Sequence, residues 1–195
     1  MTALVWLVTA ALGHTQRAAE TMGFVPVRFA DTIFWPSSVP AWLTPLTSTL
    51  VHAGLLHLAF NLLMLVWCGF AVERVLGRSA LVVLYIVGAF TSAAAQWLVA
   101  PHSIVPVIGA SGAISAVIGA FAVSFGRPRD IAKSPRVNRW LNALWLMAAW
   151  IVLQVMVGFV AGGQGMLLAT PAHVGGFLAG LLLQRPLLLW RYRGA

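Results

Sequence analysis

Two polar side chains lie within apolar segments of this sequence and have the types needed for nucleophilic catalysis. Ser111 lies in the run VIGASGAISAVIGA, and His173 lies in the run AHVGGFLAG. A hydroxyl or an imidazole in hydrocarbon costs free energy unless it has a partner. A serine beside a histidine is the minimum for an activated nucleophile, because the imidazole accepts the hydroxyl proton. The pair therefore predicts nucleophilic chemistry at Ser111, provided that the fold brings the two residues together.

The residues around Ser111 predict that a helix begins there. Pro106 and Gly109 favour irregular backbone upstream. Only about 14 residues of good helix follow Ser111, and they span roughly 21 Å, too little to cross a hydrocarbon core of about 30 Å. Irregular backbone at membrane depth must be buried in protein or line a wet cavity. The first N–H groups of such a helix can hold an anion.

Small residues at four-residue spacing predict a contact between the serine and histidine segments. Two such faces let helices approach closely, which would place His173 against Ser111. Taken alone, each stripe is usually a sign of plain helix packing. The stripes are Gly112, Ala116 and Ala120 on one segment and Ala172, Gly176 and Gly180 on the other.

Composition places both segments in an all-α polytopic membrane protein. Hydrophobic residues make up 61% of the 195 residues and charged residues 8%, against about 45–50% and 25% in soluble domains. We expect one domain over residues 1–195, a six-helix transmembrane bundle with a short or truncated first span. The expected spans are about 2–13, 50–72, 80–100, 104–125, 141–161 and 166–190.

The basic residues predict the topology. The net charge is +8, but these residues fall at the ends of apolar runs, so they indicate membrane orientation rather than a nucleic-acid partner. With six spans and both termini in the cytoplasm, 10 of the 12 basic residues face the cytoplasm. Only Arg17 and Arg28 lie outside. The ten are Arg74, Arg78, Arg127, Arg129, Lys133, Arg136, Arg139, Arg185, Arg191 and Arg193.

Four polar residues fall at one depth. Heights can be counted along each helix from the basic residues expected at its cytoplasmic end. Ser111 then lies roughly 24 Å above that end, His57 roughly 25 Å, Asn61 roughly 20 Å, and His173 between roughly 18 and 27 Å. His57 and Asn61 are four residues apart and share a helix face. His52 points elsewhere, and near a helix start a structural role suits it better than chemistry. Intramembrane histidines usually mark function.

The absence of acidic residues from the expected spans argues against several classes of membrane protein. None of these spans contains Asp or Glu, which argues against a carboxylate protease and a proton-coupled transporter built on carboxylates. The single Cys68 excludes an intrachain disulfide and a cysteine zinc cluster. We therefore expect no metal and no cofactor.

Four motifs together resemble the rhomboid intramembrane serine proteases: HAGLLHLAFN, GFAVERVLG, GASGA and AHVGG, over about residues 43–183. The resemblance implies a Ser-His dyad, with Ser111 as nucleophile and His173 as general base. It also implies oxyanion binding by His57, Asn61 and backbone N–H groups near Gly109. Gly112, Gly176, Gly180 and His52 would be structural residues near the site.

The resemblance also implies a setting and a substrate class. We expect a multi-pass protein of a bacterial inner membrane that cleaves single-span membrane proteins and contacts lipid. Two positions depart from the family pattern: Leu43 follows Trp42 where an arginine is frequent, and Ser115 stands where some members have an aromatic residue against the histidine. The alternative is a non-catalytic rhomboid-like protein that binds transmembrane helices. The sequence does not specify an oligomeric state.

Overall fold

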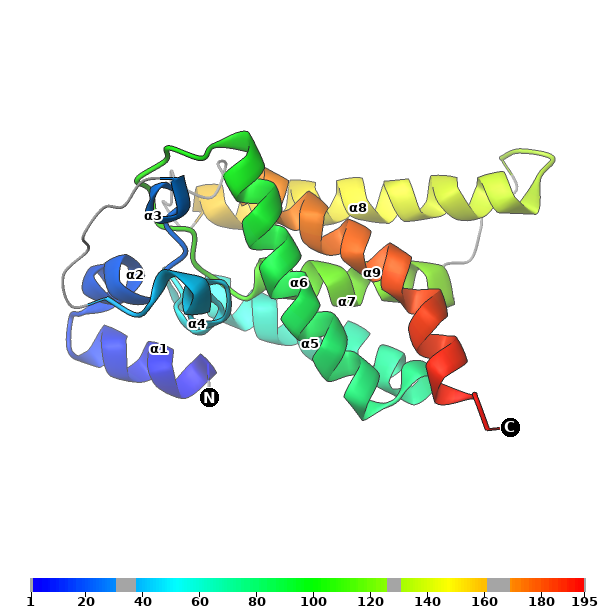
Figure 1. The fold of residues 1–195 in the computed structure, drawn as a ribbon, viewed down its shortest axis with the longest axis horizontal. Coiled ribbons are helices and arrows are strands. Elements are labelled where there is room, and N and C mark those ends of the chain that lie inside the picture. The colour runs from blue at the N-terminus through cyan, green and yellow to red at the C-terminus, as the bar shows by residue number, and fades with distance from the viewer. Residues whose placement is uncertain (1, 31–37, 126–130, 161–168, 195) are drawn as a thin grey trace.

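The computed structural model describes residues 2–30, 38–125, 131–160 and 169–194. Within these ranges the chain is helical, apart from connecting segments and one isolated β-bridge between Phe24 and Val107 (Figure 1). The expected all-α class is therefore confirmed. Six short or N-terminal elements come first: α1 (Thr2–Ala11), α2 (Thr15–Met22), α3 (Val27–Ala30), η1 (Ala41–Leu43), α4 (Thr44–Thr47) and η2 (Ser48–Leu50). Five longer helices follow: α5 (Leu55–Leu76), α6 (Arg78–Val99), α7 (Ser111–Phe125), α8 (Pro135–Val160) and α9 (Thr170–Arg191).

Four described helices, α5, α6, α8 and α9, are long and apolar enough to cross a membrane, and α1 and α7 are shorter apolar helices. Two helices start later than the expected spans. α5 begins at Leu55 rather than near residue 50, because η2 and Gly54 precede it, and α7 begins at Ser111 rather than near residue 104. Residues 166–168, where the last span was expected to start, lie outside the described residues, as do Arg127 and Arg129.

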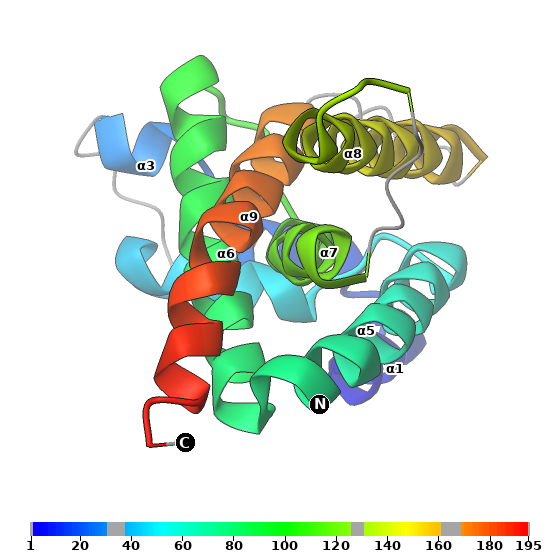
Figure 2. The same ribbon diagram turned by 90° about the vertical axis from the view of Figure 1, so that its right-hand side faces the viewer.

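The short helix α7 is the centre of the bundle. Viewed end-on, it is enclosed by α5, α6, α8 and α9 (Figure 2). Every residue from Ser111 to Ala120 is buried, and most of them are small or β-branched. Small side chains let the surrounding helices approach closely, so the helix that begins with Ser111 is fixed on all sides.

α5, α6 and α9 are joined at the end of the bundle farthest from Ser111. α5 ends at Gly77, whose φ of +86° suits glycine, and α6 begins at the next residue. Arg191 of α9 donates hydrogen bonds to the carbonyls of Glu73 (3.2 Å) and Arg74 (2.9 Å). A cation at the carboxyl end of a helix is favourable. α5 also continues beyond its expected end at residue 72, so the carboxylate of Glu73 lies in its last turn.

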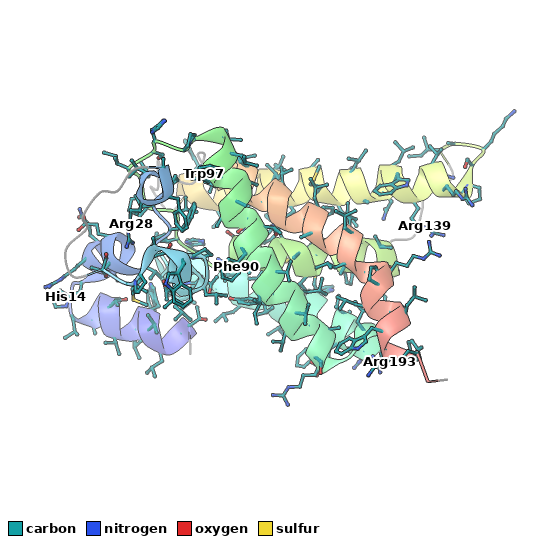
Figure 3. The ribbon with its side chains drawn as sticks, in the orientation of Figure 1. His14, Arg28, Phe90, Trp97, Arg139 and Arg193 are labelled. Carbon is teal, nitrogen blue, oxygen red and sulfur yellow. The ribbon has the colours of Figure 1, made fainter. Side chains whose placement is uncertain are left out.

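Basic side chains gather at the two ends of the molecule. Arg139 and Arg193 lie at one end, and His14 and Arg28 lie at the opposite end (Figure 3). The first residues of α7 lie toward the Arg28 end, because Phe24 N–H and Val107 N–H each donate to the other's carbonyl, over 3.0 and 2.8 Å. The segment before Ser111 is thus tied to the N-terminal region.

Candidate active site

Ser111 and His173 are in direct contact. The distance from Ser111 Oγ to His173 Nε2 is 2.8 Å, within hydrogen-bonding range. Ser111 is the first residue of α7, and His173 lies in the first turn of α9. Both side chains are buried, with exposed fractions of 6% and 3%. With neutral His173 accepting at Nε2, the serine hydroxyl donates its proton to the imidazole, which is the geometry of a base-activated nucleophile.

The small faces of α7 and α9 bring these residues together. A methyl group added at Gly176 would overlap the carbonyl oxygen of Gly112, and one added at Gly180 would overlap that of Ala116. At Gly112 an added Cβ would lie 2.7 Å from Ser92 Cβ on α6. The backbones of α7 and α9 therefore touch because these positions lack side chains.

Gly109 forms the bend that starts α7. Its φ is +110°, a conformation that residues with a side chain rarely adopt. An added Cβ would also lie 2.7 Å from His57 Nε2, so the imidazole fills the place of a side chain. The Gly109 N–H donates to the Ser48 carbonyl over 2.9 Å. Of the backbone N–H groups near Gly109 that the resemblance implies for the oxyanion, the N–H of Gly109 itself is therefore already bonded. The N–H groups of Ser111 and Gly112, in the first turn of α7, have no acceptor within the helix.

His57 and Asn61 lie on the buried face of α5, with exposed fractions of 1% and 2%. Both ring nitrogens of His57, and Oδ1 of Asn61, are without a hydrogen-bond partner among the described residues. Asn61 Nδ2 donates to the His57 carbonyl over 2.9 Å, which leaves its second N–H. These donors lie on the helix beside Gly109, where His57 is in contact with the bend.

His52 supports the bend from a second direction. Its Nε2 accepts the Ala110 N–H over a long 3.4 Å, and its ring centroid lies 4.9 Å from that of His57. The side chain is buried in the segment between η2 and α5. His52 thus contacts the residue preceding Ser111 rather than Ser111 itself.

Trp150 of α8 is a site residue that the sequence analysis missed. Its indole N–H donates to Ser115 Oγ over 2.7 Å, and Ser115 Oγ donates to the Ser111 carbonyl, also over 2.7 Å. The indole meets the His173 ring edge-on, with centroids 6.4 Å apart and planes at 74°. The serine found in place of an aromatic residue thus accepts a hydrogen bond from an aromatic side chain on another helix. A tryptophan far from the ends of an apolar run was the signal, since membrane tryptophans favour the interfaces.

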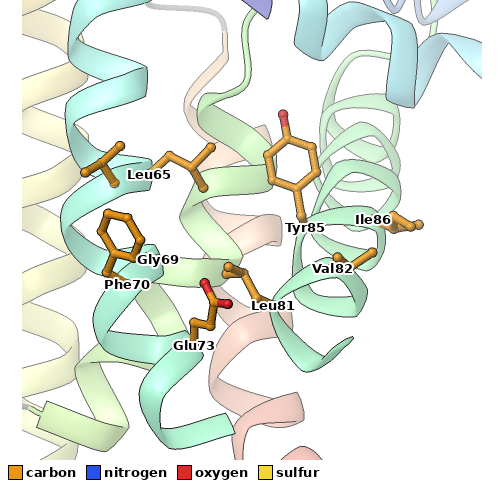
Figure 4. Close-up of a pocket in the computed structure, with 9 residues that line it drawn as sticks. Leu65, Gly69, Phe70, Glu73, Leu81, Val82, Tyr85 and Ile86 are labelled. Carbon is orange, nitrogen blue, oxygen red and sulfur yellow. The ribbon is translucent and has the colours of Figure 1, made fainter. Parts of the chain in front are cut away.

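Two hollows differ in their relation to the dyad. A cavity of about 20 Å³ borders Ser111 and His173, and the hydroxyl-bearing residues Ser48, Thr49 and Ser92 also line it. It has room for about one water molecule. An apolar groove of about 330 Å³ lies between α5 and α6, with Glu73 among its lining residues (Figure 4). None of the residues lining this groove belongs to the site, so we place no reaction there.

Comparison with known proteins identifies the family to which these features correspond. The family model described as Rhomboid domain matches residues 40–190. Rhomboid protease GlpG of Serratia proteamaculans is 33% identical over 153 residues, 76% of this chain and 50% of the relative. GlpG of Pectobacterium atrosepticum is 33% identical over 136 residues, 69% and 44% of the two chains. Rhomboid protease GluP of Bacillus subtilis is 29% identical over 140 residues, 71% and 25%. The chain thus spans half or less of the length of these relatives.

Proposed function

The chain belongs to the rhomboid family, and we propose that it is an intramembrane serine endopeptidase with Ser111 and His173 as its catalytic dyad. One observation carries the proposal: the 2.8 Å contact between Ser111 Oγ and His173 Nε2 at a buried helix start. The relatives named rhomboid proteases support the same class.

The first half-reaction forms an acyl-enzyme. Ser111 Oγ attacks the peptide carbonyl carbon while His173 Nε2 takes the hydroxyl proton. The carbonyl oxygen becomes an oxyanion, for which the Ser111 N–H and the amide and imidazole N–H groups of Asn61 and His57 are the nearby donors. The intermediate collapses when the C–N bond breaks and His173 returns the proton to the leaving amine.

The second half-reaction consumes water. A water molecule gives a proton to His173 and attacks the acyl carbon, and the proton then passes to Ser111 Oγ as the C–O bond breaks. The cavity beside Ser111 and His173 can hold about one water. The enzyme returns to its starting state with both peptide fragments released.

The substrates we propose are single-span membrane proteins whose helix unwinds near the outer surface of a bacterial inner membrane. Both termini of the enzyme would lie in the cytoplasm. The 10-to-2 distribution of basic residues supports this orientation, as does the separation of Arg139 and Arg193 from Arg28 in Figure 3.

A fluorophosphonate probe tests the proposal directly, because it reacts covalently with an activated serine. We expect the purified protein in detergent to be labelled, and Ser111→Ala and His173→Ala to be unlabelled. Ser79→Ala, which removes an exposed hydroxyl at the far end of the bundle, is the matched control and should label normally. Absence of labelling and of cleavage in the wild type, together with binding of transmembrane helices, would support the non-catalytic alternative.

A further inference from the structure

One buried amide near the dyad is not used by the chemistry described so far. Gln154 of α8 is 2% exposed, and neither its Nε2 nor its Oε1 has a hydrogen-bond partner among the described residues. A buried amide without partners is costly, and polar residues within membrane spans usually serve function. The two N–H donors and the carbonyl oxygen of Gln154 are therefore available to bind a ligand.

The pairing of α7 with α8 places Gln154 at the level of Ser111. The two helices lie side by side and run in opposite directions (Figures 1 and 2). The Trp150–Ser115 hydrogen bond fixes their register. Ser111 lies four residues before Ser115, and Gln154 lies four residues after Trp150, which is about 6 Å along each axis in the same direction. Gln154 therefore lies across from the nucleophile, on the buried face that also carries Trp150.

We propose that Gln154 binds the backbone of the substrate segment beside Ser111, a role that rests on the proposed function. An unwound segment within a membrane exposes peptide N–H and C=O groups that water does not satisfy. A glutamine amide donates to a carbonyl and accepts from an N–H, so one side chain can pair with both groups of a peptide. The ligand is thus an extended peptide backbone, recognised independently of its side chains.

α8 is the least buried of the four long helices. In an 18-residue apolar stretch of each helix, 17% of α8 is buried, against 33% of α5 and of α6 and 44% of α9. On average, α8 therefore packs less against the rest of the bundle than the other three long helices do.

The test uses Gln154→Met in a Ser111→Ala background, so that binding is measured without cleavage. Fluorescence anisotropy would give the Kd for two labelled transmembrane peptides of different sequence in detergent micelles. We expect Gln154→Met to raise both Kd values about 5- to 50-fold, because peptide groups lose their partner. The unfolding temperature without peptide should stay the same or rise, because an unpaired buried amide is removed.

Asn142→Leu is the matched control, since it removes another amide from α8 about 18 Å away along the helix. It should leave both Kd values unchanged. An unchanged Kd in Gln154→Met, a loss for one peptide sequence only, or a lower unfolding temperature would each overturn the proposal. A wild type that cleaves nothing, with the effect on Kd intact, would instead refute the proteolytic function and leave backbone binding by Gln154 standing.

Discussion

Trp150 donates its indole N–H to the hydroxyl of Ser115 across the interface between α8 and α7. The Ser115 hydroxyl in turn donates a hydrogen bond to the Ser111 carbonyl, and the indole ring meets the His173 ring edge-on. One side chain of α8 is thus linked to both members of the proposed dyad. We assign Trp150 a positioning role, because its contacts are with Ser115 and His173.

Removal of the Ser115 hydroxyl alone should lower stability more than removal of both the hydroxyl and the indole N–H of Trp150. Ser115→Ala leaves the buried indole N–H unpaired, at a cost of about 1–3 kcal/mol, and we expect a lower unfolding temperature and lower kcat. Ser115→Ala combined with Trp150→Phe removes donor and acceptor together and should recover part of the stability. Thermal unfolding in detergent and kcat for a transmembrane substrate would measure this, and additive losses would contradict the linkage.

Asn61→Ala should act on the chemical step. Removal of one oxyanion donor typically lowers turnover about 10²–10³-fold, so kcat should fall with little change in KM. Leu63→Ala, at an exposed position two residues along α5, is the control and should retain activity. A change confined to KM would move Asn61 from transition-state stabilisation to substrate binding.

Gly176→Leu should separate α7 from α9. Any side chain at residue 176 overlaps the Gly112 carbonyl, and a displacement of about 1 Å in the dyad can cost about 100-fold in rate. Cleavage of a transmembrane substrate by purified protein measures the loss, with the exposed Leu182→Ala on the same helix as control. Near-normal cleavage by Gly176→Leu would disprove the importance of this helix contact.

The dyad itself should behave as one unit. We expect Ser111→Ala and His173→Ala each to abolish cleavage, and the double variant to be no worse than either. Activity of the wild type should fall at low pH, because protonated His173 no longer accepts the serine proton. A pH–rate profile and assays of purified variants test this; residual cleavage by Ser111→Ala, free of other proteases, would refute the mechanism.

Reporter fusions should reveal the orientation. Fusions after Arg139 and at Ala195 should report the cytoplasm, and one within residues 36–40 should report the outside, because basic residues favour the cytoplasmic side. A cytoplasmic signal from residues 36–40 would invert the proposed topology.

The sequence predicted those parts of the site that depend on glycine and proline residues. Pro106 and Gly109 before a short apolar run indicated a helix that begins at Ser111, and α7 begins there. The small residues of AHVGGFLAG indicated a close helix contact near His173, and the structure brings Gly176 against Gly112. Both patterns work because glycine and proline change the backbone locally.

Trp150 and Gln154 were not found because an apolar span gives little sign of which face is buried. Almost every residue of such a helix is hydrophobic, so periodicity does not separate the lipid side from the bundle side. The bond between Gly109 N–H and Ser48 O was equally invisible. It joins residues about 60 positions apart through their main chains, which carry no sequence signal.

The hydrogen bonds from Arg191 to the end of α5 hold α9 at a point far from the dyad. From Arg191 to His173 the axis of α9 is a lever arm of roughly 27 Å. A tilt of about 2° at the Arg191 end therefore swings the imidazole by roughly 1 Å, the displacement at which catalytic geometry begins to fail. The two hydrogen bonds of Arg191 restrain this tilt at one end of α9, and the backbone contacts of Gly176 and Gly180 with α7 restrain it next to His173.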